Sequence, residues 1–244
     1  MSPSLPPHNL CTACSACASI CPKRLITFTP DKTGFLYPAI QNPASCTDCG
    51  LCEKICPALK KTLPEYPVLK TFAASAKNTA ELITSASGGA AAVISRAVIS
   101  DGGVVFGVAY TNDFSRAEYR KAETETELEQ FKGSKYIQAD KNSIFKTVKE
   151  ELKQPERENK PVLFIGLPCE IAGLKAYLSE GKEKERYNNL ITIDLICFGA
   201  TSPKVAEEYT KHLAKTHQSK ITGFSVRYKT PMTNDPWVNF TRGP

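Results

Sequence analysis

Eight cysteines lie in the first 56 residues of this 244-residue sequence, and their spacing is regular. They form two runs of C-x-x-C-x-x-C-x-x-x-C-P, namely Cys11, Cys14, Cys17 and Cys21 before Pro22, and Cys46, Cys49, Cys52 and Cys56 before Pro57. Thiolates in this pattern hold 4Fe-4S clusters, so the chemistry expected here is one-electron transfer.

The two-residue gaps let three thiolates of one tight loop reach three irons of one cube. The fourth thiolate is too far along the chain; we expect it to begin the next helix and to bind the other cube. The predicted ligand sets are therefore Cys11, Cys14, Cys17 and Cys56 for one cluster, and Cys46, Cys49, Cys52 and Cys21 for the other. A pair of zinc sites is the alternative, because C-x-x-C also suits tetrahedral zinc. Two duplicated runs, each closed by proline, favour clusters and an α+β ferredoxin-like fold.

Composition and charge limit the other classes of function. The formal charge of +6 is scattered in mixtures such as residues 182–186 (KEKER), whereas a nucleic-acid interface would show a concentrated basic stripe. The most apolar stretch, residues 83–110, is interrupted by Arg96 and Asp101, which argues against a membrane span. The N-terminus lacks the features of a signal peptide, so ten cysteines point to metal or redox chemistry in a cytoplasmic protein.

The pattern changes after the second run, which divides the chain into a cluster module (residues 1–62), a linker (63–70) and a second domain (71–244). Short apolar runs at 71–76, 103–110, 161–166 and 190–196 predict buried strands. Helical patterns cover 88–100, 143–153, 170–180 and 203–216. Alternating strands and helices predict an α/β domain with a parallel or mixed sheet.

Two segments of the second domain could bind a phosphorylated cofactor. Ser87, Gly88 and Gly89 precede a helix of small residues, and free amides at a helix start suit a phosphate. A serine cap with glycines that permit close packing is the alternative. Ser134, Lys135 and Tyr136 lie in a basic and aromatic stretch, which by itself is typical of a solvated loop.

The two remaining cysteines each follow a predicted strand. Cys169 starts a helix in GLPCEIAGLK, and Cys197 lies in DLICFGA. Ligands of open α/β sheets bind at the carboxyl ends of strands, and a thiol at a helix N-terminus is expected to have a lowered pKa. The alternative is a buried structural thiol.

Taken in order, SASGG, GGVVFGVAY, GSKYIQAD, GLPCEIAGLK and DLICFGATSPKV resemble the beta-subunit family of coenzyme F-420 hydrogenases and dehydrogenases. The later SVRYKTPMTNDPWVNF is similar to that family's Arg-x-Lys and Trp-x-x-Phe stretch. The resemblance implies an FAD-binding domain that exchanges electrons between a two-electron donor and iron–sulfur clusters. Members normally continue beyond this stretch, so we expect a chain that is incomplete at its C-terminal end.

The resulting interpretation is an oxidoreductase dependent on FAD and two 4Fe-4S clusters, whose partner is a deazaflavin-type coenzyme or a redox protein. The resemblance places Ser87, Gly88, Gly89, Ser134, Lys135 and Tyr136 at the flavin. Cys169 and Cys197 would line the flavin or bind a further 4Fe-4S cluster. The alternatives are a non-catalytic electron-relay subunit, in some relatives linked to polysaccharide genes, and a redox sensor or scaffold that uses the clusters structurally.

Overall fold

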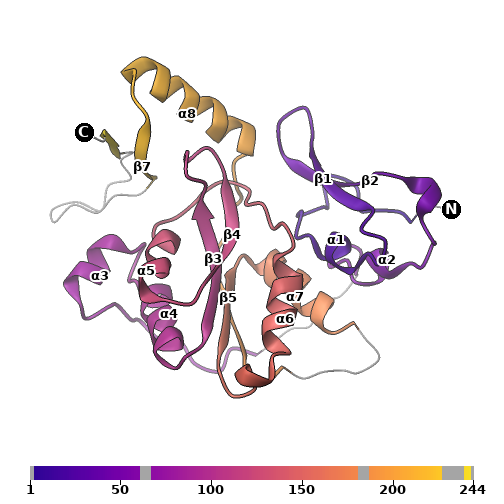
Figure 1. The fold of residues 1–244 in the computed structure, drawn as a ribbon, viewed down its shortest axis with the longest axis horizontal. Coiled ribbons are helices and arrows are strands. Elements are labelled where there is room, and N and C mark those ends of the chain that lie inside the picture. Colours follow the sequence, from indigo (N-terminus) through magenta and orange to yellow (C-terminus); the bar gives the residue numbers. More distant parts are fainter. Residues whose placement is uncertain (1–2, 61–66, 181–186, 227–238, 243–244) are drawn as a thin grey trace.

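Two short helices and a hairpin make up the N-terminal part of the chain (Figure 1). The computed structural model describes residues 3–60, 67–180, 187–226 and 239–242. In the N-terminal part the elements are α1 (Ala16–Ile20), β1 (Ile26–Pro30), β2 (Leu36–Ile40), the 3-10 turn η1 (Pro43–Ser45) and α2 (Leu51–Lys54). The antiparallel strands β1 and β2 pair from Ile26 with Ile40 to Pro30 with Leu36.

The fourth cysteine of each run does not begin a helix, contrary to the sequence-based expectation. Cys21 follows the last residue of α1, and Cys56 comes two residues after α2. Each helix instead starts between the second and third cysteines, directly after Ser15 or Gly50 in the left-handed conformation. The helix itself therefore carries the chain from the three-cysteine loop to the fourth thiol.

A four-stranded mixed sheet forms the centre of the second part, with the strand order β4-β3-β5-β6. Strands β3, β5 and β6 are parallel, and β4 pairs antiparallel to β3 at one edge. The strands are β3 (Val104–Tyr110), β4 (Ala117–Ala122), β5 (Val162–Gly166) and β6 (Leu190–Asp194). The helices and 3-10 turns around them are α3 (Thr79–Thr84), α4 (Ala90–Ser100), α5 (Glu125–Leu128), η2 (Glu129–Phe131), α6 (Ile144–Leu152), η3 (Pro155–Arg157) and α7 (Pro168–Leu178).

Helices cover both faces of this sheet, and the alternation of side chains along the strands explains why. On β3, Phe106 joins the larger hydrophobic core, whereas Val105 joins the smaller core on the opposite face. On β5, Phe164 and Leu163 divide in the same way. Successive side chains of a strand point to opposite faces, so strands that are apolar at every position need cover on both. Helices α6 and α7 cover one face, and α4 and α5 cover the other (Figure 1).

Most predicted elements of the second part are confirmed, with two differences. Residues 71–76 are exposed apart from Ala76 and form no strand. They run past the loop before α4, where the Ala76 amide donates to the Gly88 carbonyl. Strand β6 is present, but Ile191 is 42% exposed, so it is not the buried strand that its apolar sequence predicts.

The described chain ends with α8 (Pro203–His217) and a hairpin of β7 (Ile221–Ser225) with β8 (Asn239–Arg242). The charged run at 182–186 and most of the SVRYKTPMTNDPWVNF segment lie outside the described residues. Among the helices that the structure describes, none combines the length and apolar character needed to cross a membrane.

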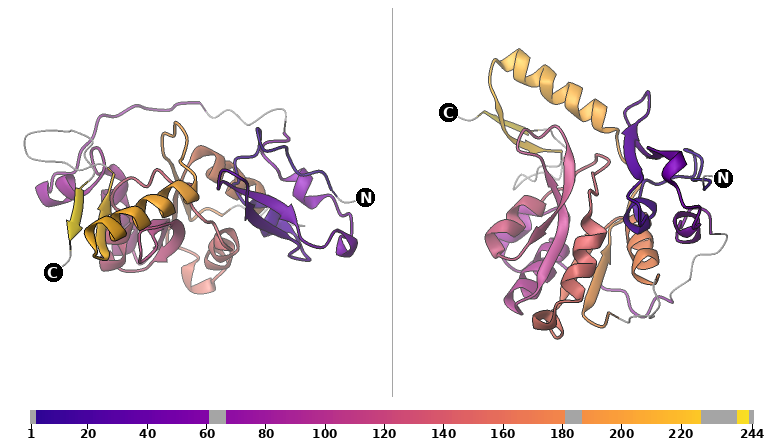
Figure 2. Two further views of the ribbon diagram at one scale, coloured as in Figure 1. Left: turned by 90° about the horizontal axis from the view of Figure 1, so that it is seen from above. Right: turned by 45° about the vertical axis from the view of Figure 1, so that its right-hand side comes forward.

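The N-terminal part packs on the outer side of α6 and α7, so that these helices lie between it and the sheet (Figures 1 and 2). Ala16 of α1 and Ile55 after α2 join the same core cluster as Phe145 and Leu174. Two hydrogen bonds link the backbone of Leu36 to the side-chain amide of Gln138, at 2.7 and 3.0 Å. Lys54 also pairs with Glu180 at the far end of α7. The cysteine-bearing loops are therefore packed directly against the α/β part.

Candidate iron–sulfur site

The eight N-terminal cysteines line two cavities, four to each. The inner cavity is named for its position next to α7, and its lining includes Cys11, Cys14, Cys17 and Cys56. The lining of the outer cavity includes Cys21, Cys46, Cys49 and Cys52. Each cavity thus combines three thiols of one run with the fourth thiol of the other, which is the grouping that crossed ligation requires.

Matching backbone conformations shape the two cysteine loops. Ala13 and Ser15 have φ of 53° and 66°, and the corresponding residues of the second run, Asp48 and Gly50, have φ of 51° and 67°. Left-handed residues alternating with ordinary ones turn successive N–H groups into a concave nest, an arrangement that occurs at iron–sulfur sites. The two loops therefore present the same backbone to their cavities.

Backbone N–H groups donate to the thiols of the inner cavity. The amides of Ala13, Ala16 and Ala18 donate to Cys11, Cys14 and Cys17, respectively. Such bonds stabilise a sulfur that carries negative charge, as a cluster ligand does. Taken by themselves, these hydrogen bonds lower the pKa values of the three thiols.

Burial works in the opposite direction on the free thiols. It raises the pKa of Cys14 to about 11 and raises the pKa of Cys17 further, and the thiolate of Cys14 adds to the second effect. Metal must displace the protons of these thiols, so loading releases protons and is favoured by higher pH. Within the described residues, no three His, Cys, Asp or Glu side chains converge as they would around a single metal ion. Four sulfurs around a cavity form a donor set that fits a 4Fe-4S cube.

The two cavities differ in their access to solvent. In the inner set, Cys14, Cys17 and Cys56 are buried, whereas in the outer set Cys49 is exposed and only Cys52 is buried. The outer cavity is therefore the one that another molecule can approach closely.

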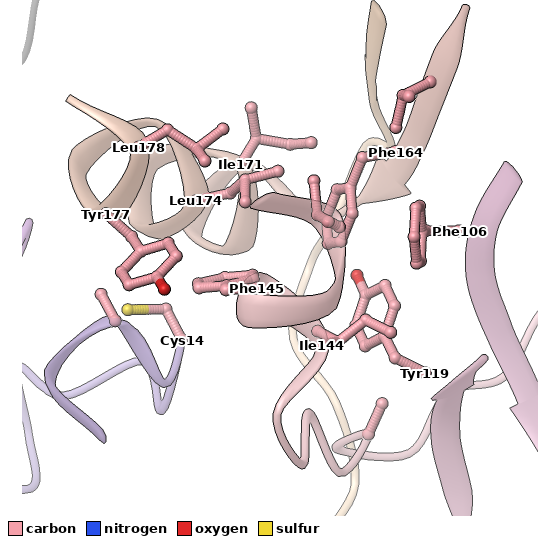
Figure 3. Packing of buried hydrophobic residues seen from close by; sticks show 14 of the residues in the cluster. Cys14, Phe106, Tyr119, Ile144, Phe145, Phe164, Ile171, Leu174, Tyr177 and Leu178 are labelled. Carbon is pink, nitrogen blue, oxygen red and sulfur yellow. The ribbon is translucent and has the colours of Figure 1, made fainter. Parts of the chain in front are cut away.

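Helix α7 of the α/β part closes on the inner cavity. A Cβ placed on Gly173 would lie 2.9 Å from the Cys14 sulfur, so only glycine fits at this position. Phe145 and Tyr177 lie beside Cys14 in the same cluster (Figure 3). Cys14 thus lies both in a cysteine loop and in the core of the α/β part.

Cys169, at the second position of α7, also lies close to the inner cavity. The side chain of Thr12, which lines that cavity, forms a hydrogen bond with Cys169. The pKa of Cys169 is raised rather than lowered, in contrast to the expectation for a helix start, because burial dominates and the neighbouring Glu170 carboxylate adds to it. The helix dipole does not offset these two effects.

Cys197 is exposed and lies near Cys169. A negative charge on the Cys197 sulfur raises the pKa of Cys169 further. The two cysteines follow β5 and β6, which are neighbouring parallel strands. Strand ends therefore bring them to one edge of the sheet. The amide of Gly199 donates to the Cys197 sulfur at 3.3 Å.

The two segments expected at a flavin lie close together, joined through Glu81 of α3. This buried carboxylate pairs with Arg96 of α4 at 2.7 Å and with Lys132 at 3.0 Å, and it accepts from the hydroxyl of Ser85. Lys132 also donates to Thr84 at 3.0 Å. The loop before α4 and the Lys132–Tyr136 stretch therefore form one connected region.

Packing alone accounts for the two glycines of this region. A Cβ on Gly88 would lie 2.6 Å from the carbonyl oxygen of Ala74, and Gly89 has a φ of +75°. Ser87 is also left-handed, with a φ of 47°. The structure thus supports the close-packing alternative for Gly88 and Gly89, while the start of α4 at Ala90 remains available to an anion.

Lys135 is a cation in unusual surroundings. Its ammonium donates to the carbonyls of Gln130 and Lys132 and lies 5.8 Å from the ring centre of Tyr110. Burial lowers the pKa of Lys135 from 10.5 to about 7. The hydroxyl of Tyr110 is buried, and the described residues give it no hydrogen-bond partner. A polar ligand is one group that would satisfy both side chains. Ser134 lies in the same loop, and Tyr136 is 44% exposed.

Sequence reasoning missed Lys141, Glu170 and Tyr119, which form a buried polar group beside the inner cavity. Lys141 pairs with Glu170 at 2.9 Å, and Glu170 accepts from the Tyr119 hydroxyl at 2.5 Å and from the Leu167 amide at 2.8 Å. The only local signal was an acidic residue three positions into the helix of GLPCEIAGLK, where it caps the N-terminus. Its partners are 29 and 51 residues away in the chain, which no local pattern reveals.

Comparison with protein families gives two matches. Residues 10–59 match the 4Fe-4S dicluster domain. Residues 159–241 match the family of the C-terminal part of the coenzyme F420 hydrogenase/dehydrogenase beta subunit. A search of curated proteins gives no significant match.

Proposed function

We propose that this chain, a member of the coenzyme F420 hydrogenase/dehydrogenase beta-subunit family with a 4Fe-4S dicluster domain, is a flavin-dependent iron–sulfur oxidoreductase. It would move electrons between a two-electron partner bound at the α/β part and a one-electron partner at the outer cavity. The observation that carries the proposal is the gathering of eight thiols into two sets of four, one of them in direct contact with α7.

The proposed ligands are Cys11, Cys14, Cys17 and Cys56 at the inner cavity, and Cys21, Cys46, Cys49 and Cys52 at the outer cavity. When bound, the clusters would supply one-electron carriers. Protein purified and analysed under anaerobic conditions should contain about eight iron and eight sulfide ions per chain. Zinc in place of iron after anaerobic reconstitution would refute the cluster proposal.

Crossed ligation is tested by two matched variants. Cys21→Ser removes a thiol of the outer cavity, although Cys21 belongs to the first run, and Cys56→Ser removes a thiol of the inner cavity. Electron paramagnetic resonance should show selective loss or conversion of a different cluster in each variant. If Cys21→Ser instead affected the same cluster as Cys11→Ser, each run would hold its own cluster.

The flavin is the finer part of the proposal, supported by the resemblance and by the connected region around Ser87, Lys132 and Lys135. When bound, FAD would accept two electrons together and release them singly. The chain's own contribution would be the helix start at α4 for a phosphate, and the Lys135 ammonium with the Tyr110 hydroxyl for polar atoms of the ligand. Ser134 and Tyr136 belong to the same loop, and Gly88 and Gly89 would shape the backbone.

Flavin content is measured independently of the clusters. Full-length native protein should release about one FAD per chain on acid treatment. Lys135→Met should lower that content while the iron content stays the same. A chain with its iron but without any flavin would remove this part of the proposal and leave the clusters in place.

The two-electron partner is proposed to be a deazaflavin coenzyme of the F420 type, following the name of the matching family. An electron-relay subunit serving another enzyme is the second candidate, and the exposed Cys49 at the outer cavity favours a protein partner on that side. Anaerobic mixing of the protein with reduced F420 distinguishes the oxidoreductase from the electron-relay subunit. Bleaching of the cluster absorbance by the isolated protein supports the oxidoreductase, whereas reduction only by a partner protein supports the relay.

Cys169 and Cys197 are proposed to line the path between the flavin and the inner cavity. The contact of Cys169 with Thr12 supports this assignment for the first thiol. A further 4Fe-4S cluster at these residues would raise the iron content above that of the eight-cysteine module. The double variant Cys169→Ser and Cys197→Ser should keep its iron content, and a loss of iron would favour the additional cluster.

A further inference from the structure

One glutamine of the α/β part binds the hairpin β1–β2 of the N-terminal part as a neighbouring strand would. The Leu36 amide donates to Oε1 of Gln138 at 2.7 Å, and Nε2 of Gln138 donates to the Leu36 carbonyl at 3.0 Å. A strand in a sheet offers its neighbour the same combination of one donor and one acceptor. Among the described strands, β2 has β1 as its one partner. Gln138 therefore satisfies both backbone groups of the first residue of β2.

The segment that carries Gln138 is fixed by backbone hydrogen bonds to two neighbours. The Gln138 amide donates to the Thr201 carbonyl at 3.0 Å, and the Thr201 amide donates to the Tyr136 carbonyl at 2.8 Å. Two residues further on, the Asp140 amide donates to the carbonyl of Ala117, the first residue of β4, at 2.8 Å. The side chain of Gln138 thus extends from a backbone that is held to the α/β part before and after it.

The turn of the same hairpin lies against the start of α8 (Figures 1 and 2). Gly34, between β1 and β2, is so close to the Lys204 side chain that there is no room for a Cβ at this glycine. Lys204 follows Thr201 by three residues, and Thr201 forms a parallel bridge with Ile137. The hairpin therefore contacts two segments of the α/β part that are hydrogen-bonded to each other.

Both of these segments continue directly from residues proposed at the flavin. Lys135 lies three residues before Gln138, and Cys197 lies four residues before Thr201. The hairpin, in turn, belongs to the same part of the chain as the eight cysteines. Electron transfer slows steeply as the distance between donor and acceptor grows. A contact that joins the flavin loop to the cysteine-bearing part is therefore placed to control that distance.

We propose that Gln138 is a positioning residue for electron transfer, which holds the N-terminal part on the segment that follows the proposed flavin loop. It thereby fixes the distance between the flavin and the inner cluster, and in each step the cluster gains the one electron that the flavin loses. Docking of the hairpin and cofactor binding at the loop stabilise each other, because coupling between two sites is reciprocal. This inference rests on the proposed function, because it requires a flavin at this loop.

The experiment compares Gln138→Met and Gln138→Glu with the wild-type holoprotein under anaerobic conditions. Met keeps the length of the side chain without its amide, and Glu keeps the acceptor for the Leu36 amide but turns an oxygen toward the Leu36 carbonyl. Hydrogen–deuterium exchange of the peptide that contains Leu36 should be about tenfold faster in both variants. Adding FAD to flavin-free protein should slow this exchange in the wild type and leave it unchanged in the variants.

The rate of electron transfer is the second measurement. After flash photoreduction of the bound flavin, reduction of the clusters should be slower in both variants, while the flavin content, the iron content and the cluster potentials stay the same. Lys54→Met is the matched control, because it removes another contact between the same two parts, the pair with Glu180 at the far end of α7. It should change neither the exchange at Leu36 nor the rate.

A side chain that only fills space would be replaced adequately by Met or Glu. Wild-type exchange and wild-type rates in Gln138→Met and Gln138→Glu, with flavin and clusters bound, would therefore overturn the inference alone. Exchange at Leu36 that FAD does not slow in the wild type would overturn it as well. A wild-type protein that lacks the flavin or the two clusters would overturn the proposed function, and this inference with it.

Discussion

Ser15 and Gly50 occupy equivalent positions in the two cysteine loops and have almost the same positive φ, 66° and 67°. Glycine adopts this conformation freely, whereas a residue with a side chain does so at a cost of about 1 kcal/mol. The hydroxyl of Ser15 is also buried, and it has no hydrogen-bond partner among the described residues. The first loop therefore carries a local cost that the second loop avoids.

We predict that Ser15→Gly raises the free energy of unfolding by about 1 kcal/mol, because it removes both the strained backbone and the unpaired hydroxyl. Anaerobic urea denaturation of the cluster-loaded protein measures the change. Lower stability in the variant would show that the hydroxyl donates to a cluster atom, and that this bond exceeds the backbone cost.

Lys135 gives a prediction about pH. Burial lowers its pKa in the folded protein from 10.5 to about 7. Between these two values the unfolded chain binds a proton that the folded chain does not, so stability rises with pH across that window, by at most about 1.4 kcal/mol per pH unit. Lys135→Met should lose this dependence, whereas a variant of the exposed Lys215 should keep it. Parallel pH profiles for wild type and Lys135→Met would show that Lys135 keeps its proton when buried.

At the scale of elements, the close contact of α7 with the first cysteine loop depends on the absence of a side chain at Gly173. Gly173→Ala would place a carbon 2.9 Å from the Cys14 sulfur and 3.0 Å from its Cβ, with the Phe145 ring at 3.4 Å. Neither a helix nor a ligand loop can shift freely, so we expect a cost of about 1–3 kcal/mol. The spectrum of the inner cluster should change while that of the outer cluster stays the same. Equal changes in both clusters would point to general unfolding of the N-terminal part.

The Arg96 side chain connects three elements of the region proposed for the flavin. It binds Glu81 of α3, Glu125 of α5 and Glu129 of η2, at 2.6–2.7 Å. Arg96→Met leaves the buried Glu81 with fewer partners, so we predict a loss of about 1–2 kcal/mol together with weaker flavin retention. Lys54→Met, which removes the cation of a more exposed pair with Glu180, should change stability little. Unchanged flavin content in Arg96→Met would separate this network from the cofactor site.

Two of the strands that sequence reasoning found are buried along most of their length. Strands β3 and β5 are apolar at nearly every position because helices cover both faces of the sheet. A short continuous apolar run of this kind can be recognised from the sequence alone. Strand β4 was missed because AEYRKA alternates charged and apolar residues at the sheet edge. Residues 71–76 have a strand-like composition, but none of the described strands pairs with them, so tertiary context decides against a strand here.

The candidate site likewise has features that the sequence predicted and features that it did not. The two cysteine sets were predicted from the spacing within each run and from the exchange of the fourth thiol between runs, and the two cavities group the thiols in the same way. The raised pKa of Cys169 could not be predicted, because burial is its main cause. The Lys141–Glu170 pair could not be predicted either, because its two residues are 29 positions apart in the sequence.

At the scale of the whole molecule, the helices, the sheet and the cysteine loops are stacked in successive layers. The sheet with α4 and α5 lies on one side, α6 and α7 lie in the middle, and the cysteine loops lie on the other side (Figure 2). Cys14 of the inner cavity joins the core of the α/β part, whereas Cys49 of the outer cavity is exposed. This order gives the two proposed clusters different distances from solvent.

We therefore predict that a soluble paramagnetic dysprosium chelate speeds the electron-spin relaxation of the outer cluster more than that of the inner cluster. The chelate cannot enter the packed protein, and its effect falls steeply with distance, so exposure alone decides the result. Cys21→Ser and Cys56→Ser assign the two signals, because they remove ligands of different cavities. If the signal lost in Cys56→Ser were the more strongly relaxed one, the inner cavity would be the accessible face. The electron route would then run in the reverse order, with the outer cluster nearer to the two-electron partner.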